Sequence, residues 1–210
     1  MIKKQSGHGG NIRELATRLG CQPEEILDFS ANINPFGPPE YLWNILSARM
    51  ADIVQYPDPD STELVQVLAE QYQLSAEQIV PGNGTSDLLY ACLRAVGANP
   101  CVRPSLWGRG RHRDLPLQPV IQRAIIPVPA YIDYRQACER ADIRVLSLPL
   151  SADDDFQPDL EEIATQLQAG DLLILGQPNN PTGRMIDRTA LLTLVDQHPD
   201  VLFMLDEENV

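Results

Sequence analysis

The sequence has few basic residues for its size. Its 210 residues contain 16 Lys and Arg against 29 Asp and Glu, which gives a formal net charge of −13. A surface with this charge balance repels the phosphate backbone of nucleic acids, so we do not expect a nucleic-acid-binding protein. An anionic small substrate would need a local cluster of arginines.

Several other signals are absent as well. No apolar run approaches the length of a membrane span, and the start, MIKKQSGHGGN, lacks the apolar core of a signal peptide, so we expect no membrane partner and a cytoplasmic protein. The four cysteines form no CxxC pair and no close metal-binding spacing, which favours reduced, structural cysteines and no metal site. No Walker-type GKS or GKT occurs, which argues against a nucleotide triphosphatase.

The most informative stretch, residues 171–183, reads DLLILGQPNNPTG. Leu172–Leu175 is a short apolar run, typical of a strand buried on both faces of a parallel sheet, and two prolines stiffen the loop behind it. A second apolar run, Val201–Leu205, leads directly into Asp206, and the residues between the two runs have helical spacing. The loop alone would be an ordinary turn. Together, the two runs predict a strand–helix–strand unit with amides and a carboxylate at the ligand-binding edge of an α/β sheet.

These two motifs, QPNNPTG and LDE, resemble the large domain of the fold-type I pyridoxal-phosphate enzymes, the aminotransferase class I/II superfamily. The resemblance implies an α/β fold with a parallel-rich sheet flanked by helices, truncated in this chain, and pyridoxal 5'-phosphate as the cofactor. It also implies that Asn180 hydrogen-bonds the cofactor's phenolic oxygen and that Asp206 holds the pyridine nitrogen protonated. A carboxylate beside the ring keeps it cationic, so that it can accept carbanion electrons.

Three further segments extend the resemblance. A glycine-rich turn, PGNGTS, precedes a helical pattern, and such helix starts offer backbone N–H groups to a phosphate. The resemblance makes Gly84, Thr85 and Ser86 the cup for the cofactor phosphate, and it places Tyr131, in VPAYIDY, against the pyridine ring. It also sends Tyr56, in YPDP, to the cofactor phosphate of a neighbouring subunit, which implies a homodimer. From the residues alone, each of these two tyrosines is equally well explained as an aromatic that packs against its surroundings.

The N-terminal region narrows the family. The pieces HGGN and DFSANINPFGPP occur together and are similar to the threonine-phosphate decarboxylase family of cobalamin biosynthesis, a relative of histidinol-phosphate aminotransferase. By that resemblance His8, Gly9 and Asn32 bind the phosphate and carboxylate of a phosphorylated amino acid, L-threonine O-3-phosphate. The implied reaction is its decarboxylation to 1-amino-2-propanol phosphate. A histidinol-phosphate-type aminotransferase is the alternative, and a non-catalytic remnant is the alternative from another class.

One residue that this enzyme class needs has no match. The resemblance requires a lysine that attaches the cofactor as a Schiff base, but the lysines of the sequence are Lys3 and Lys4, at the start of the chain. The residues after Glu207 also depart from the family pattern. We therefore expect no catalytic lysine within the 210 residues, an inactive chain when it is alone, and the missing part encoded further along the DNA, in some reading frame.

The domain organisation follows from the same pattern. Residues 1–52 are expected to form an N-terminal arm with a segment of a small domain, and residues 53–210 the first part of the cofactor-binding domain. Within the latter, residues 99–122 contain four prolines and four arginines without periodicity. This composition favours a poorly ordered insertion, with a substrate-gathering loop as the alternative. Ser61 is expected to cap the helix that follows it.

Overall fold

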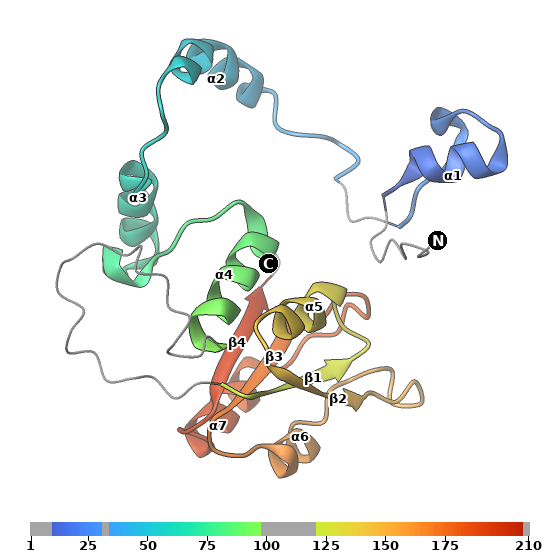
Figure 1. The fold of residues 1–210 in the computed structure, drawn as a ribbon, viewed down its shortest axis with the longest axis vertical. Coiled ribbons are helices and arrows are strands. Elements are labelled where there is room, and N and C mark those ends of the chain that lie inside the picture. The colour runs from blue at the N-terminus through green and yellow to red at the C-terminus, as the bar shows by residue number, and fades with distance from the viewer. Residues whose placement is uncertain (1–9, 31–33, 98–120, 208–210) are drawn as a thin grey trace. The chain divides into compact units, whose positions relative to one another are not determined.

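The computed structural model describes residues 10–30, 34–97 and 121–207. The chain divides into two compact units, Met1–Ile79 and Val80–Val210, and each is described by itself (Figure 1). The predicted domain boundary, at residues 52 and 53, lies inside the first unit, and the assignment of these segments to a small and a large domain stays a prediction.

The first unit is built from short helices with almost no core of their own. Among its described residues, Ala16 of the first helix is the one buried residue, whereas Phe29, Phe36 and Tyr56 are almost fully exposed. The helices contact the short 3-10 turns next to them in the chain. Their bounds are α1 Ile12–Leu19, α2 Tyr41–Arg49 and α3 Thr62–Tyr72, with 3-10 turns at Pro23–Glu25, Met50–Val54 and Ala76–Gln78.

The cap of α3 differs from the expectation. Ser61 has the left-handed φ of 48° and its side chain makes no capping hydrogen bond. Instead, the Thr62 N–H donates to Oδ2 of Asp58 at 2.7 Å, and this bond lowers the pKa of the Asp58 carboxyl. Ser61 is therefore at the N-cap position, as predicted, but a carboxylate one turn earlier in the chain makes the capping hydrogen bond in its place.

The second unit contains a fully parallel four-stranded sheet in the order β2-β1-β3-β4. The predicted α/β fold with a parallel sheet is confirmed. The strands are β1 Arg123–Val128, β2 Arg144–Pro149, β3 Asp171–Gln177 and β4 Leu202–Glu207. The helices are α4 Gly84–Gly97, α5 Ile132–Arg140, α6 Leu160–Gln166 and α7 Arg188–Gln197.

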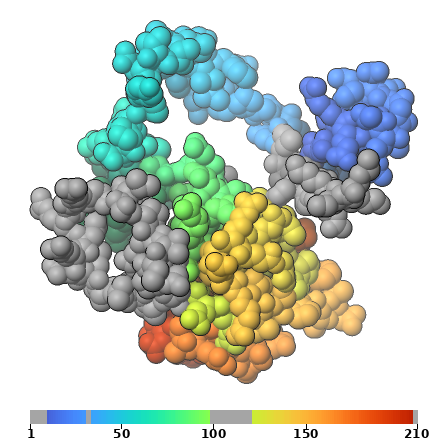
Figure 2. Space-filling model, viewed as in Figure 1, coloured from blue at the N-terminus to red at the C-terminus, as the bar shows by residue number. Residues whose placement is uncertain are grey.

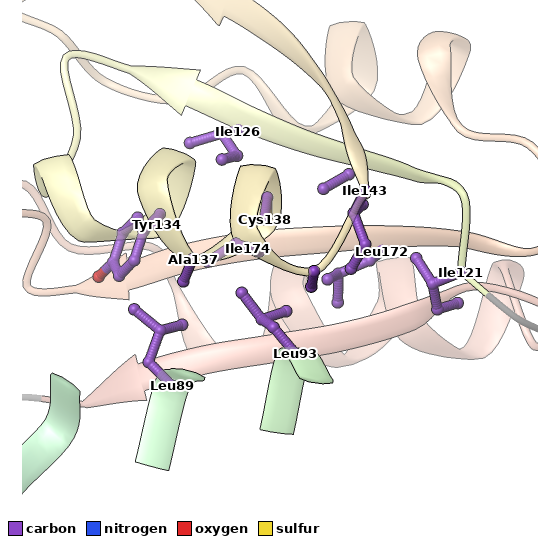
Figure 3. Close-up of a cluster of buried hydrophobic side chains, with 12 residues drawn as sticks. Leu89, Leu93, Ile121, Ile126, Tyr134, Ala137, Cys138, Ile143, Leu172 and Ile174 are labelled. Atoms are coloured by element: carbon purple, nitrogen blue, oxygen red, sulfur yellow. The ribbon is translucent and has the colours of Figure 1, made fainter. Parts of the chain in front are cut away.

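Helices cover both faces of this sheet because its central strands are apolar on both sides. All seven residues of β3 are buried. Leu172 and Ile174 point into the cluster formed with α4 and α5, drawn in Figure 3, whereas Leu173 and Leu175 point into the cluster formed with α6 and α7. The alternation is the period of two of a strand, and it explains why β3 appears in the sequence as an uninterrupted apolar run. Figure 2 shows α4 and α5 packed beside each other on this unit.

The strand order places a switch point between β1 and β3. The chain runs from β1 outward to β2 through α5, and from β3 outward to β4 through α7, in opposite directions. Right-handed crossovers in opposite directions require helices on opposite faces, which is where α5 and α7 pack. Ligands bind in open α/β sheets at the carboxyl edge of such a switch point. The fold therefore directs attention to the loops after β1 and β3.

The opposite edge of the same two strands is held by a buried ion pair. Arg123 and Asp171 are register partners, and the guanidinium donates through Nε to Oδ1 at 2.8 Å and through a terminal nitrogen to Oδ2. The Gln168 N–H also donates to this carboxylate, at 2.7 Å. Hydrogen bonding to Asp171 raises the pKa of Arg123 against the opposing effect of burial.

The predicted insertion at residues 99–122 needs a correction at its end. Ile121 is buried in the α4–α5 cluster, and its N–H donates to the carbonyl of Val96 at 3.1 Å. The carbonyl of Gln122 accepts from the Arg144 N–H at 2.9 Å. These two residues were therefore wrongly included in the insertion, because their backbones form hydrogen bonds with the end of α4 and the start of β2. The rest of the predicted insertion, residues 99–120, lies outside the described residues.

Candidate active site

The carboxyl edge of the switch point carries a group of polar side chains from four segments. They come from the start of α4, the loop and first turn after β1, the loop after β3, and the end of β4. Of the predicted site residues, the structure places Ser86, Tyr131, Asn180 and Asp206 in these four segments. The carboxyl ends of parallel strands meet at one edge of a sheet, which is why residues so distant in the sequence gather there.

Asp206 is held by a tyrosine that the sequence reasoning missed. It lies at the end of β4 opposite Gly176 of β3, and its Oδ2 accepts a hydrogen bond of 2.7 Å from the hydroxyl of Tyr134. Figure 3 shows the Tyr134 ring at one end of the apolar cluster. The spacing of Tyr131 and Tyr134, three residues apart at a helix start, was the signal for two tyrosines on one helix face.

Gly176 is required at its position in β3 by a close approach. A Cβ atom there would lie 3.1 Å from both the Tyr134 hydroxyl oxygen and the Cα atom of Asn179. The missing side chain therefore lets the tyrosine and the loop after β3 approach the strand end together.

The second tyrosine, Tyr131, belongs to a hydrogen-bonded group with Ser86 and Asp133. The Ser86 hydroxyl lies 3.2 Å from the Tyr131 hydroxyl and donates to Oδ2 of Asp133 at 3.0 Å. The rings of Tyr131 and Tyr134 meet edge to face, with centroids 5.6 Å apart and an interplanar angle of 83°. The hydrogen bond with Ser86 favours ionisation of Tyr131, but burial and the carboxylates of Asp133 and Asp206 outweigh it, and the pKa of Tyr131 is raised.

The loop after β3 uses its amides in different ways. Gln177 is buried and closes the base of the loop, because its Nε2 donates to the Ile186 carbonyl at 2.8 Å and its Oε1 accepts from the Ile186 N–H at 2.9 Å. Asn179 is also buried, and its Nδ2 donates to the carbonyl of Pro129 at 3.0 Å and to the Thr182 hydroxyl at 2.8 Å. These bonds tie the loop to the segment after β1.

The remaining amide of this motif is placed differently. Within the described part of the chain, the half-buried side chain of Asn180 makes no hydrogen bond. Gln177 and Asn179 therefore have structural roles, and the amide of Asn180 has none among the described residues. The prediction that Asn180 contacts a cofactor remains a prediction, but its hydrogen bonding differs from that of Asn179, the neighbouring amide.

The same loop is braced from its outer side by residues 151–157. The guanidinium of Arg184 pairs with the Asp155 carboxylate, and its Nε donates to the Asp155 carbonyl at 2.7 Å. Gln157 donates to the carbonyl of Met185 at 3.1 Å. The backbone of Arg184 accepts from the Asn179 N–H at 2.8 Å, so this brace continues into the amide-bearing part of the loop.

The predicted phosphate cup lies at the start of α4. The helix begins at Gly84, whose φ of +81° is in the left-handed region that favours glycine. The first N–H groups of a helix lack partners within it, and here Gly84 and Thr85 are exposed. One nearby donor is already engaged, since the Asn83 N–H donates to Oδ2 of Asp87 at 3.0 Å.

The remaining predicted site residues lie in the other unit or outside the described residues, so their predicted roles are not tested. Tyr56 lies in the first unit and is 99% exposed, so its predicted contact with a neighbouring subunit stays a prediction. His8, Gly9 and Asn32 lie outside the described residues. The described residues contain no cluster of His, Cys, Asp and Glu able to hold a metal ion. No helix in the described ranges combines the length and apolarity needed to cross a bilayer.

Fold and site together define a doubly wound α/β protein with a candidate ligand site at the switch point of a parallel sheet. Residues 119–208 match the family model described as aminotransferase class I and II. This part of the chain, from β1 to β4, is an aminotransferase class I and II domain segment. The resemblance drawn from its motifs is thereby confirmed.

Curated relatives narrow the likeness. The chain is 35% identical over 204 residues to the adenosylcobalamin biosynthesis bifunctional protein CobDQ of Leptospira interrogans, covering 95% of this chain and 21% of that protein. It is 34% identical over 195 residues to the threonine-phosphate decarboxylase of Salmonella typhimurium, covering 91% of this chain and 46% of that enzyme. The chain therefore spans less than half the length of these two relatives.

A solved structure agrees with this likeness. L-threonine-O-3-phosphate decarboxylase from Porphyromonas gingivalis superposes with a TM-score of 0.66 at 26% identity, covering 88% of this chain and 47% of that one. Histidinol-phosphate aminotransferase from Sinorhizobium meliloti, solved in complex with pyridoxal-5'-phosphate, gives a TM-score of 0.65 at 22% identity, covering 83% and 42%. At 22% identity, the similarity to the second structure shows a shared fold and no more.

Proposed function

We propose that this chain is part of a pyridoxal-phosphate-dependent threonine-phosphate decarboxylase of cobalamin biosynthesis. The observation that carries the proposal is the arrangement at the switch point. There, the hydroxyl of Tyr134 fixes the carboxylate of Asp206. The same unit contains Asn180, whose half-buried side-chain amide makes no hydrogen bond among the described residues. The relatives from Leptospira interrogans and Salmonella typhimurium, whose names refer to cobalamin synthesis and to this decarboxylase, support the choice of reaction.

The residues present fit the chemistry of pyridoxal phosphate. A cationic pyridine ring needs an anionic partner at its nitrogen, and Asp206 provides one whose position is fixed by a hydrogen bond of 2.7 Å. The phenolic oxygen needs a donor, which Asn180 offers. The cofactor phosphate needs backbone donors, and Gly84 and Thr85 lie exposed at the start of α4.

In the proposed enzyme the bound cofactor supplies an electron-accepting ring. The chain's own residues would bind and orient that ring. Asp206 holds the proton on the pyridine nitrogen, Asn180 donates to the phenolic oxygen, and the aromatic face of Tyr131 limits movement of the ring. The backbone of Gly84, Thr85 and Ser86 would anchor the phosphate.

The proposed substrate is the phosphorylated amino acid L-threonine O-3-phosphate. Its Cα–carboxylate bond breaks, CO₂ leaves, and a proton is added at Cα, which yields 1-amino-2-propanol O-2-phosphate. His8, Gly9 and Asn32 are proposed to bind the phosphate and carboxylate of this substrate. A homodimer, in which Tyr56 reaches the partner's cofactor phosphate, and a cytoplasmic location are part of the same proposal.

Neither of the lysines of this sequence, Lys3 and Lys4 at the start of the chain, is proposed to attach the cofactor. Residues 1–210 by themselves should therefore bind a cofactor form that needs no lysine, pyridoxamine 5'-phosphate, without catalysing turnover. The alternative from another class, a non-catalytic remnant that binds cofactor or a partner weakly or does nothing, predicts no turnover and at most weak cofactor binding.

A second catalytic candidate is a histidinol-phosphate-type aminotransferase. It is favoured by relatives such as the enzyme of Stutzerimonas stutzeri, which is 28% identical over 201 residues and covers 95% of this chain and 48% of that enzyme. The N-terminal HGGN motif favours the decarboxylase.

The test begins with titration of residues 1–210 with pyridoxamine 5'-phosphate, followed by cofactor absorbance. We expect saturable binding that Asp206→Ala weakens about tenfold or more, as a hydrogen-bonded charge pair at the ring nitrogen requires. The exposed Asp142→Asn serves as the matched control. The protein that includes the attachment lysine is then given L-threonine O-3-phosphate. Release of CO₂ supports the decarboxylase, amino transfer to a keto acid supports the aminotransferase, and absence of cofactor binding refutes both.

A further inference from the structure

A buried carboxylate beside the candidate cofactor residues has no role in the proposed function so far. Asp133 lies in the first turn of α5 and is 6% exposed. A buried carboxylate is costly unless hydrogen bonds compensate for its lost hydration, so its partners indicate what it does. One of these partners is the hydroxyl of Ser86, at the start of the neighbouring helix α4.

The hydrogen-bond directions in this group follow from the number of protons. An ionised carboxylate only accepts, so the Ser86 hydroxyl gives its single proton to Oδ2 of Asp133 across 3.0 Å. The oxygen of Ser86 also lies 3.2 Å from the Tyr131 hydroxyl oxygen. The Tyr131 hydroxyl also hydrogen-bonds directly to the side chain of Asp133, so the carboxylate accepts from both hydroxyls.

This chain of bonds fixes the ring of Tyr131 from one end, and Tyr134 fixes it from another side. The two rings meet edge to face at 83°, while Tyr134 is itself bonded to Asp206. A ring anchored at its hydroxyl and against its edge has a defined plane. The face of Tyr131 is thus oriented by the polar groups behind it.

We propose that Asp133 is a positioning residue that sets the plane of the Tyr131 ring, directly and together with Ser86, and thereby orients the surface on which the cofactor ring stacks. The inference rests on the proposed function. It adds that different residues act on the ring and on the phosphate of the cofactor. Because the Ser86 proton is committed to Asp133, Ser86 meets the cofactor phosphate through its backbone N–H. Asp133 therefore acts on the ring end of the cofactor, and the start of α4 acts on the phosphate end.

The first test needs no ligand. The ionisable groups around Tyr131 are Asp133 and Tyr134 of α5 and Asp206 of β4. Ultraviolet titration of the tyrosines, with the Tyr131→Phe variant subtracted, isolates the Tyr131 signal. Asp133→Asn should move this signal to lower pH, and Asp142→Asn, the same change at an exposed position near the end of α5, should leave it in place. An unmoved signal in Asp133→Asn overturns the proposal.

The second test compares a ligand that has a ring with one that has none. Asp133→Asn should weaken binding of pyridoxamine 5'-phosphate to residues 1–210 about fivefold, the effect of one hydrogen-bonded link, and reduce the circular dichroism that each bound cofactor acquires. Affinity for inorganic phosphate, measured by competition, should stay within about twofold. Equal losses for both ligands indicate a phosphate-binding or merely structural role and overturn the proposal.

A further variant keeps the test informative if Asp133→Asn does not fold. Ser86→Ala removes one of the two hydroxyls bound to Asp133 but keeps the carboxylate, and should reproduce part of the loss for pyridoxamine 5'-phosphate. The double variant Ser86→Ala/Asp133→Asn should lose no more than Asp133→Asn alone, because the Ser86 hydroxyl acts on the same path through the Asp133 carboxylate. Additive losses contradict the path. If the unsubstituted chain binds neither ligand, the proposed function and the stacking role both fail, whereas the titration still decides whether Asp133 controls Tyr131.

Discussion

The hydrogen bond between Tyr134 and Asp206 allows a prediction about the heart of the site. Tyr134→Phe removes the hydroxyl that donates to Asp206 at 2.7 Å and leaves the ring, which is 2% exposed, in its apolar cluster. The change therefore isolates one hydrogen bond to a carboxylate.

The magnitude follows from burial on each side of this bond. A hydrogen bond to a charged group contributes about 1.5–3 kcal/mol. Asp206 is half-buried, so water replaces part of the lost interaction, and we expect the free energy of unfolding to fall by about 1–2 kcal/mol. Affinity for pyridoxamine 5'-phosphate should also fall, by roughly threefold, because the carboxylate proposed to meet the ring nitrogen is less well oriented.

Urea unfolding followed by circular dichroism measures the first quantity, and cofactor absorbance the second. Tyr90→Phe is the matched control, since Tyr90 is half-buried on α4 and its ring, which the substitution keeps, lies 5.0 Å from the guanidinium of Arg140. On an Asp206→Ala background, the effect of Tyr134→Phe should shrink. If Tyr134→Phe destabilises no more than Tyr90→Phe, the reasoning about this hydrogen bond is refuted.

Three further predictions concern the sheet and its core. Asp171→Asn should lower the free energy of unfolding by about 3 kcal/mol, the lower end of the range for a broken buried pair, because the half-buried Arg123 keeps its charge without a counter-ion. Replacing both residues with apolar ones should cost much less in the same urea titration, and equal costs would contradict the ion-pair argument. Gly176→Ala should cost about 1–3 kcal/mol, since the new Cβ atom presses on Tyr134 and the loop after β3; a neutral effect in thermal unfolding would show that this approach has slack. Burial raises the pKa of the Cys138 thiol from 9.0 to about 11, so the folded state retains its proton where the unfolded chain has lost it. Stability should therefore fall more steeply across that range of pH in the unsubstituted chain than in Cys138→Ala, and parallel curves would refute it.

Local patterns in the sequence were enough to predict most of the second unit. The apolar run of β3 is continuous because both faces of that strand are buried, and this pattern needs no knowledge of its neighbours. The helical spacing before β4 and the carboxylate at its end likewise predicted the strand–helix–strand unit. Four motifs then pointed to one edge of one sheet. The C-terminal boundary of the predicted insertion was placed too late, because the burial of Ile121 depends on α4, far from it in the sequence.

The sequence by itself determined the parallel sheet, the family, and the motifs that hold Asn180 and Asp206. The tertiary structure alone decided which groups support them. Gln177, Asn179 and Asn180 are chemically similar amides. Only the contacts with Ile186 and Pro129 give the first two structural roles, whereas the side chain of Asn180 makes no hydrogen bond among the described residues. Asp133 and Tyr134 appear as ordinary helix residues until the fold brings them to Ser86 and Asp206. The physical reason is that a hydrogen bond between side chains depends on distances of about 3 Å, which are set by the register of strands and the packing of helices rather than by spacing along the chain.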